Sequence, residues 1–317
     1  MNKFFLFLLC PLFCFSQSAL EKAENLLTQK NYKKAELVLI SFVSENPNNL
    51  KAIEYLGDAY GYQDQWDAAR IQYKKLVNAK PAVANYHYKY GGVLAMKALE
   101  VNKLKALTII DDVKEAFLTA ARLDANHINT RWALVELYMQ LPGIIGGSMK
   151  TSLKYANELE ALSEVDGYLA KGYIYEYDDE PELAEHYYKK AITVGGSLTC
   201  YEKLSNFYES TNEPNKAVAT IEASQQKHQR NALHYQIGKV AAEYDIQLGK
   251  GETCLHTYIE HYSPEDGVPK AWAYYRLAQI YKHQKDKVKA LKFIDLAITD
   301  LPKIKVFKTE KEQILNL

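Results

Sequence analysis

The residues nearest to a known chemical motif are a run of glycines followed by a lysine and a threonine. They are Gly143, Gly146, Gly147, Lys150 and Thr151. Loops that bind phosphate combine these residue types, because backbone amides wrap the phosphate and the lysine neutralises it. Such a loop needs glycine directly before the lysine and follows a β-strand. Here Met149 precedes the lysine and the segment before the loop has a helical pattern, so we predict no nucleotide site.

Metal-binding and catalytic side chains do not fall into a usable pattern. His256 and Glu260 are one helical turn apart, but a zinc-binding helix needs a second histidine four residues from the first, and His261 is five away. No serine lies in the setting of a nucleophile, and neither Cys200 nor Cys254 has a base near it in sequence. These cysteines either form a disulfide in an exported protein or pack as small hydrophobes. We therefore predict no catalytic residue, no metal site and no cofactor, in a protein that is not an enzyme.

The first seventeen residues differ from the rest of the chain and predict export. Lys3 supplies a positive charge, residues 4–15 form an apolar run, and residues 16–18 are small and polar. This order is typical of a signal peptide. We expect cleavage after residues 1–17 and a periplasmic or secreted protein, with retention as a membrane anchor as the alternative. Cys10 and Cys14 each follow a bulky residue, which disfavours lipid attachment.

Composition and charge are those of an ordinary globular protein. The chain has 317 residues, of which 48% are hydrophobic and 25% charged, and Lys+Arg and Asp+Glu both number 39. This balance shows no bias toward nucleic acid or a membrane surface, and we predict no nucleic-acid partner. Prolines and glycines fall at regular intervals instead of in one linker. We therefore expect one elongated unit and not two separable domains.

A spacing of small and large residues recurs eight times and dictates the fold class. Its clearest copy is Leu56, Gly57, Tyr60, Ala69, Tyr73 and Pro81. Large residues recur at i, i+3, i+4 and i+7 in two runs with a break between them, which is typical of two short amphipathic helices. Two helices cross closely only where neither carries bulk, so the small residues mark the crossing. The spacing predicts an all-α stack of helical hairpins.

These residues resemble the tetratricopeptide repeat, whose usual period is about 34 residues. The same frame returns in Tyr168, Gly172, Tyr175, Ala184, Tyr188 and Ala191, and in Tyr274, Leu277, Ala278, Tyr281, Ala290, Ile294, Ala297 and Pro302. The resemblance implies a right-handed superhelical solenoid of about eight hairpins over residues 18–302. Residues 303–317 are expected to form a capping helix, because the terminal unit of a solenoid presents a polar outer face.

Two adjacent copies of the repeat contain insertions. Residues 97–112 lengthen the third copy, and residues 141–148 swell the turn between the two helices of the fourth. The second insertion comprises Leu141, Pro142, Gly143, Ile144, Ile145, Gly146 and Gly147, followed by Ser148. Turns between first and second helices lie on one edge of a solenoid, so we expect the insertions to meet there. Either they form a composite apolar site that docks on a membrane protein of an envelope assembly, or the loop merely covers the extra helical turns.

Solenoids of this family line a concave groove with their first helices, and the resemblance assigns groove positions to this chain. These are Glu54, Asp58, Tyr62, Tyr88, Trp132, Glu136, Tyr173, Glu176, Tyr177, Asn206, Glu209, Tyr235, Trp272, Tyr275 and Gln279. The set is aromatic and acidic, and in a neutral chain this places the basic residues on the second helices. Some of these tyrosines can instead pack between neighbouring helices.

The expected guest of such a groove is a basic or apolar segment of a protein or peptide, held by aromatic anchors. We therefore predict an exported, non-catalytic scaffold or adaptor. A subunit of an envelope assembly and a protein that binds glycans or small ligands are the alternatives.

Overall fold

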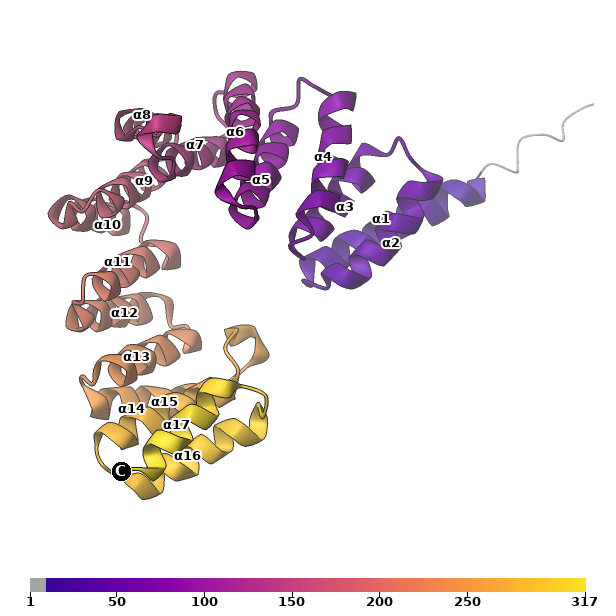
Figure 1. Ribbon diagram of the computed structural model, residues 1–317. Helices are drawn as coiled ribbons and strands as arrows, with labels where there is room; N and C mark the ends of the chain where they lie inside the picture. Colours follow the sequence, from indigo (N-terminus) through magenta and orange to yellow (C-terminus); the bar gives the residue numbers. More distant parts are fainter. Residues whose placement is uncertain (1–9) are drawn as a thin grey trace, which may run out of the picture. The chain divides into compact units, whose positions relative to one another are not determined.

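The structure is a computed structural model that describes residues 10–317, where all regular structure is helical. Seventeen α-helices follow one another, the first sixteen as antiparallel pairs (Figure 1), and no β-strand occurs in this range. The pairs are α1 (Cys10–Thr28) with α2 (Tyr32–Glu45), α3 (Leu50–Gly61) with α4 (Trp66–Ala79), α5 (Ala84–Glu100) with α6 (Lys103–Leu123), α7 (Ile128–Gln140) with α8 (Met149–Leu162), α9 (Glu164–Tyr177) with α10 (Pro181–Val194), α11 (Leu198–Ser210) with α12 (Pro214–His228), α13 (Asn231–Tyr244) with α14 (Leu248–Glu260), and α15 (Lys270–His283) with α16 (Lys287–Asp300). The last helix is α17 (Lys305–Leu315), and two short 3-10 helices are η1 (Gly143–Ile145) and η2 (Pro264–Asp266). The predicted all-α class of helical-hairpin repeats is confirmed.

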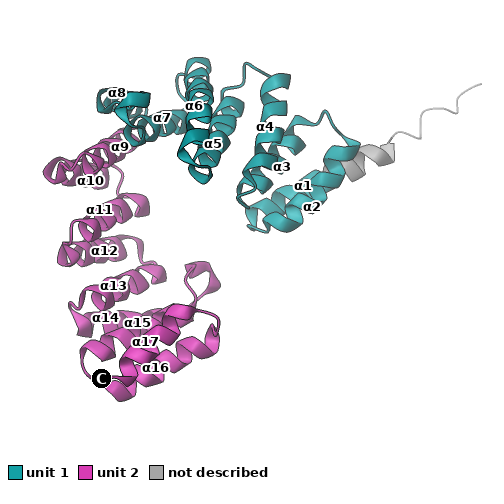
Figure 2. Ribbon diagram, in the orientation of Figure 1, with its two compact units in different colours: residues 1–162 teal, residues 163–317 magenta. Residues whose placement is uncertain are grey.

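The chain divides into two compact units, residues 1–162 and residues 163–317 (Figure 2). Unit 1 ends with α8, and unit 2 begins with α9 after a connection of one residue, Ser163. Sequence analysis predicted one elongated unit and did not anticipate this boundary.

The predicted signal segment, residues 1–17, lies outside the described residues as far as residue 9. Its remaining residues belong to α1, which begins at Cys10. Within residues 10–317, no helix combines the length and the apolar character needed to cross a bilayer.

In hairpins of both units, a glycine of the first helix closely faces a large side chain of the second. Such pairs are Gly57 with Tyr73, Gly91 with Phe117, Gly172 with Tyr188 and Gly238 with Leu255. A Cβ atom added to any of these glycines would lie between 2.3 and 2.8 Å from the facing side chain. That is closer than two carbon atoms can pack, so a larger residue would force the helices apart. Close crossing is thus the reason for the small residue in the repeat.

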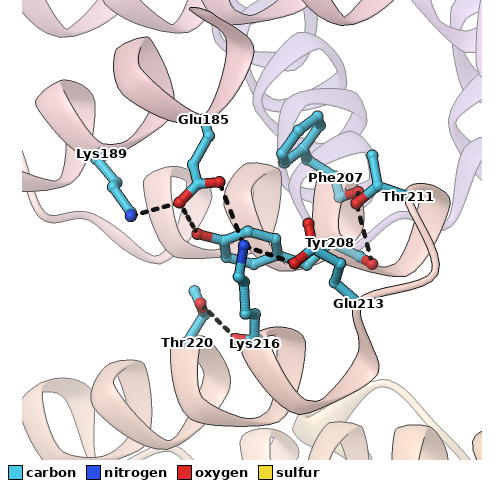
Figure 3. A network of polar contacts seen from close by, with 8 residues as sticks. All are labelled: Glu185, Lys189, Phe207, Tyr208, Thr211, Glu213, Lys216 and Thr220. Atoms are coloured by element: carbon cyan, nitrogen blue, oxygen red, sulfur yellow. Dashed lines mark hydrogen bonds and ion pairs between the residues drawn. The ribbon is translucent and has the colours of Figure 1, made fainter. Parts of the chain in front are cut away.

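Successive hairpins of unit 2 are also joined by a buried tyrosine. Tyr208 of α11 donates its hydroxyl to Glu185 of α10 at 2.9 Å (Figure 3). Lys189 donates to the same carboxylate at 2.5 Å, and Lys216 of α12 lies over the face of the Tyr208 ring. The hydrogen bond from Lys189 and then that from Tyr208 lower the pKa of Glu185, against the opposing effect of burial. One tyrosine therefore connects three helices of two hairpins.

The same arrangement recurs in the last hairpin. Tyr281 of α15 donates to Glu252 of α14 at 2.6 Å, and Lys289 of α16 lies over its ring. In both hairpins the lysine follows the tyrosine by eight residues. Polar pairs, and not only apolar burial, therefore specify how these hairpins stack.

The helix α17 covers the apolar side of the last hairpin. Phe307 is fully buried, and the ring centroids of Trp272 and Tyr275 lie 5.0 and 5.1 Å from that of Phe307. The segment for which sequence analysis predicted a capping helix, residues 303–317, thus contributes to the core of unit 2.

Candidate functional site

The predicted groove acids of unit 1 are paired with a lysine of the next hairpin. Glu54 and Asp58 lie on α3, and Nζ of Lys89 on α5 is 2.7 Å from a carboxylate oxygen of each. Burial acts to lower the pKa of Lys89, but the two carboxylates outweigh it and the pKa is raised. Sequence analysis expected the basic residues on second helices. Lys89 lies on a first helix, about one repeat after Asp58, and therefore meets the acids directly.

Two of the predicted groove acids also accept hydrogen bonds from the tyrosines at the hairpin crossings. Tyr73 donates to Asp58 at 2.7 Å, and Tyr188 donates to Glu176 at 2.6 Å. Burial first, and then the neighbouring carboxylate, raise the pKa of both tyrosines, so both remain protonated donors. Ser210 of α11 adds a bond to Glu176 at 3.3 Å. These acids therefore help to position the helices on which they lie.

A chain of ion pairs connects the first helices of unit 2. Lys239 of α13 lies 3.0 Å from Glu209 of α11 and 3.7 Å from Glu243 on its own helix. Glu243 in turn lies 2.6 Å from Arg276 of α15. We call Glu209, Lys239, Glu243 and Arg276 the charge ladder. Where sequence analysis expected an acidic wall, the ladder pairs each acid with a base.

Three of the predicted groove aromatics belong to the core of unit 2. Tyr235 and Tyr275 are each only 6% exposed, and Trp272 is half-buried against Phe307 of α17. Gln279 donates to the hydroxyl of Tyr275 at 3.0 Å. These side chains therefore pack between helices. This is the alternative that the sequence left open for some of the tyrosines.

Two other predicted aromatics are accessible. Tyr62 in unit 1 and Tyr177 in unit 2 are each more than half exposed. Tyr62 stacks on Tyr32 with ring centroids 4.6 Å apart, and Tyr177 lies near Tyr173, at 6.2 Å. Tyr62 directly follows α3 and Tyr177 ends α9, both first helices, whereas Tyr32 begins the second helix α2.

The remaining groove positions of unit 1 lie on α5 and α7. Tyr88 is half-buried, with its ring centroid 5.2 Å from that of His127. Trp132 is half-buried and Glu136 is exposed. Tyr88 lies next to Lys89 on α5, and Trp132 and Glu136 lie on α7, the first helix of the next hairpin.

Unit 2 contains a cavity of about 380 Å³ between α11, α12, α13 and η2. This size lies within the range of about 300 to 1,000 Å³ that is usual for ligand pockets. Two predicted groove residues, Asn206 and Glu209, line it, whereas Tyr235, the neighbour of Gln236 on α13, does not. Its lining residues are Leu198, Tyr201, Glu202, Ser205, Asn206, Glu209, Ile221, Ser224, Arg230, Ala232, Leu233, Gln236, Glu265 and Asp266. We call this space the unit 2 cavity.

The floor of the unit 2 cavity contains a buried hydroxyl without a hydrogen-bond partner. Ser224 of α12 is only 1% exposed, and its Oγ bonds to no group of residues 10–317. A buried hydroxyl left unpaired costs about 1 to 3 kcal/mol, so such groups are rare unless they serve a purpose. Nearby Ser205 is satisfied, because it donates to the backbone oxygen of Glu202 at 3.0 Å.

The rim of the unit 2 cavity is mainly acidic. Four carboxylates and one guanidinium line it, and Glu209 is already paired with Lys239. Asp266 is held in place by Asn231, which donates to it at 2.9 Å. Glu202 and Glu265 are exposed and form no ion pair with another residue of the described chain.

Sequence analysis missed the part of the rim that comes from η2. Asp266 and Ser263 form a capping box, in which each side chain bonds to the backbone of the other. The Ser-Pro-Glu-Asp run that begins at Ser263 is a signature of such a cap, and it could have indicated an ordered turn there.

The two predicted insertions of unit 1 lie beside each other. Lys114 of α6 donates to the backbone oxygen of Ile145 at 2.5 Å, and a shallow depression lies between α6 and η1. Its lining residues are Leu107, Ile110, Asp111, Lys114, Ile144, Ile145 and Gly146. Ile144 is 95% exposed, so the loop does not bury this residue against the extra helical turns.

The backbone of the second insertion explains why glycine stands at residues 146 and 147. A Cβ on Gly147 would lie 1.6 Å from the backbone oxygen of Leu141, and Gly146 has a φ of +97°, in the left-handed region. The backbone amide of Gly147 donates to Pro142 at 3.1 Å. Tight closure of the loop therefore explains the run of glycines that resembles a phosphate loop.

The histidines and cysteines singled out in the sequence line neither the unit 2 cavity nor the depression beside η1. Within residues 10–317 no three His, Cys, Asp or Glu side chains gather as a metal site requires. His256 packs on Phe293, and His261 bonds to the backbone oxygen of Thr257. Cys200 and Cys254 are free thiols, and burial raises the pKa of Cys254.

The hairpins, their glycine crossings and the polar links between them define an all-α helical-repeat protein. The family model of the tetratricopeptide repeat matches residues 165–194, which cover most of α9 and α10, and residues 273–299 in α15 and α16. These two segments are therefore tetratricopeptide repeats. No curated protein matches it.

Two solved structures of bacterial proteins are similar to this chain. A tetratricopeptide repeat protein from Parabacteroides merdae is similar, with a TM-score of 0.50 and 14% identity over 95% of this chain and 98% of that one. A thermophilic tetratricopeptide repeat protein from Thermus thermophilus has a TM-score of 0.45 and 14% identity over 71% of this chain and 98% of that one. At 14% identity, the likeness to the Parabacteroides merdae protein shows the fold alone.

Proposed function

We propose that this protein is a non-catalytic scaffold that binds a segment of a partner protein or peptide, with a basic side chain of the partner seated in the unit 2 cavity. Its fold is one of protein-binding scaffolds. The observation that carries the proposal is the cavity itself, which joins an apolar floor, an acidic rim and the unpaired hydroxyl of Ser224.

A lysine or arginine side chain matches this combination. Its aliphatic stem contacts Leu198, Ile221 and Leu233, and its charged head reaches the rim, where Glu202 and Glu265 are exposed. Hydrogen bonds between ionised groups are about twice as strong as those between neutral groups, so these two carboxylates dominate recognition. Backbone or side-chain groups of the partner supply the hydrogen bond that Ser224 lacks.

The test uses selection from a phage-displayed library of random peptides. We expect selected peptides to contain a lysine or arginine flanked by apolar residues, and fluorescein-labelled copies to bind in anisotropy measurements. The Glu202→Gln/Glu265→Gln variant is expected to bind them at least about tenfold more weakly, because two charge-assisted contacts are lost. The matched control, Glu182→Gln/Glu312→Gln, changes two exposed carboxylates of unit 2 outside the cavity and should bind normally.

Two outcomes would reject the proposal. One is selection of peptides without a cation, or equal binding when the cation is replaced by glutamine. The other is an equal loss of affinity in the control variant, which would indicate a general effect of charge and not the cavity.

Ser224→Ala separates binding from stability. Removing an unpaired buried hydroxyl should leave the free energy of unfolding unchanged or raise it by about 1 kcal/mol, while peptide affinity falls several-fold. Urea unfolding and the same anisotropy assay measure the two effects. A variant that is less stable and binds normally would mean that Ser224 serves the fold and not the partner.

We also propose that residues 1–17 direct export and that the protein acts in the periplasm or outside the cell. The positive charge, apolar run and small exit residues support this. Cell fractionation followed by N-terminal sequencing tests it, and recovery of the intact chain in the cytoplasm would contradict it.

A further inference from the structure

The hairpin of α5 and α6 extends beyond the point where its helices cross. Sixteen residues separate Gly57 from Tyr73, but twenty-six separate Gly91 from Phe117. Because both pairs mark the crossing, the ten additional residues lie on the turn side, about five on each helix. At about 1.5 Å per residue, they lengthen the turn side of this hairpin by about 7 Å relative to α3 and α4.

The turn end of this hairpin has leucine side chains that are exposed to solvent. Leu99 is 73% exposed and Leu104 is 79% exposed, and Leu107 is also exposed. Ile144 of the adjacent insertion lies with Leu107 along the same depression. We call Leu99, Leu104, Leu107 and Ile144 the apolar tip.

Lys103 and Lys105 flank the apolar tip and, against the one acid of residues 99–107, Glu100, they leave this segment with a net charge of +1. Lys103 and Lys105 are exposed and form no ion pair within residues 10–317. Lys97, deeper in the hairpin, is paired with Asp67 at 2.8 Å. The positive charge is confined to the end of the hairpin, because Asp111 and Asp112 follow farther along α6.

The turn that presents these side chains is short and well capped. Only Val101 and Asn102 connect the two helices, and the side chain of Asn102 accepts a hydrogen bond from the amide of Lys105. The backbone that carries the leucines is therefore already ordered, and binding costs little backbone conformational entropy.

We propose that the apolar tip inserts into the interface of a lipid bilayer that contains anionic lipids, with Lys103 and Lys105 on the headgroups. Segments that lie in a membrane interface bury their apolar side chains by about 5 to 10 Å, which matches the added length of the hairpin. Attraction of each surface lysine to anionic lipid adds to this. A narrow end with separate leucines between lysines suits a fluid surface better than a protein interface, which needs about 800 Å² of complementary surface on each partner.

The test is co-sedimentation of the protein, as recovered from cells, with two kinds of vesicle. One is pure phosphatidylcholine, and the other contains one-quarter phosphatidylglycerol. We expect at least about tenfold stronger partitioning to the anionic vesicles, and weaker binding as salt is raised. Leu99→Ser/Leu104→Ser/Leu107→Ser should lose at least about tenfold in partitioning, and Lys103→Gln/Lys105→Gln should lose the preference for anionic vesicles.

A matched control replaces three exposed apolar residues elsewhere, in Leu37→Ser/Ile71→Ser/Val288→Ser. It should bind vesicles as the unchanged protein does, and circular dichroism should show equal helical content in all variants. Insertion is also read from Leu104→Trp: the emission that this variant adds to that of the unchanged protein, which has three tryptophans, should shift to shorter wavelength on anionic vesicles. Absence of sedimentation with either vesicle, equal loss in the control, or no shift would overturn the proposal and leave a protein surface as the occupant of the tip. None of these outcomes bears on peptide binding by the unit 2 cavity.

Discussion

Two hairpins, α5 with α6 in unit 1 and α9 with α10 in unit 2, have the same kind of helix crossing. They differ in the residues beyond that crossing. In both, a glycine of the first helix receives an aromatic ring of the second, Gly91 with Phe117 and Gly172 with Tyr188. The second hairpin is compact, and its carboxylate Glu185 links it to the next hairpin. The first continues past the crossing into an exposed end rich in leucine.

The comparison teaches that the repeat constrains only a short part of each hairpin. Close packing requires small and large residues to face each other at the crossing, because interiors have few voids and tolerate little added volume. Residues beyond the crossing bear no such constraint, so a hairpin can lengthen there without loss of its core. Function can therefore be added at the turn side of a repeat while the stack is preserved.

The largest expected effect comes from breaking the shared crossing. Gly91→Ala would place a Cβ 2.8 Å from Phe117, and Gly172→Ala would place one 2.5 Å from Tyr188, so each should lower the free energy of unfolding by about 1 to 3 kcal/mol. The control is Gly92→Ala, next in the same helix, where an added Cβ meets no atom within 4 Å. It should stabilise by up to about 1 kcal/mol, because alanine favours helix more than glycine does. Urea unfolding measures all three, and equal effects of Gly91→Ala and Gly92→Ala would refute the crossing as the constraint.

A smaller effect is expected from the Glu185 link between the compact hairpin and the next one. Glu185→Gln should lower the free energy of unfolding by about 1 kcal/mol near neutral pH, because it removes the charge from bonds made by Lys189 and Tyr208. The pKa of Glu185 is lowered from its ordinary value of 4.5, so the unfolded chain binds the proton more readily. This contribution is therefore complete above about pH 4.5 and is lost as pH falls through the lowered pKa.

Unfolding of both forms at several pH values checks the sign. The curves for the unchanged protein and for Glu185→Gln should converge toward acid pH. A difference that stays constant down to acid pH would mean that the charge of Glu185 contributes nothing, and that the two hairpins differ only in length.

The sequence predicts contacts within a hairpin better than contacts between hairpins. The spacing of Gly57 and Tyr73, or of Gly172 and Tyr188, is short, and helical periodicity determines it directly. The pairing of Lys89 with Glu54 and Asp58 spans about one repeat, so it depends on how one hairpin is rotated on the next, which periodicity does not specify. The same reason explains why Tyr235 and Tyr275 were placed in the groove although they are buried.

The unit 2 cavity shows a second limit of prediction. Asn206 and Glu209 were identified from their positions on a first helix, but the cavity also needs Ser224 of the second helix and Asp266 of η2. No repeat position specifies η2, which lies in a connection between hairpins. Its place on the rim follows from the bond of Asp266 to Asn231, which only the folded chain reveals.

The charge ladder has a mechanical consequence for unit 2. Each of its pairs between helices joins first helices that are adjacent in the stack, so any bending that separates those helices must part charges before it disturbs apolar packing. The stiffness of this face should then depend on the ionic strength of the surroundings, because dissolved ions weaken partly exposed pairs and leave buried side chains untouched. We therefore expect unit 2 to flex more readily at high salt concentration than in dilute buffer, with its helices intact in both.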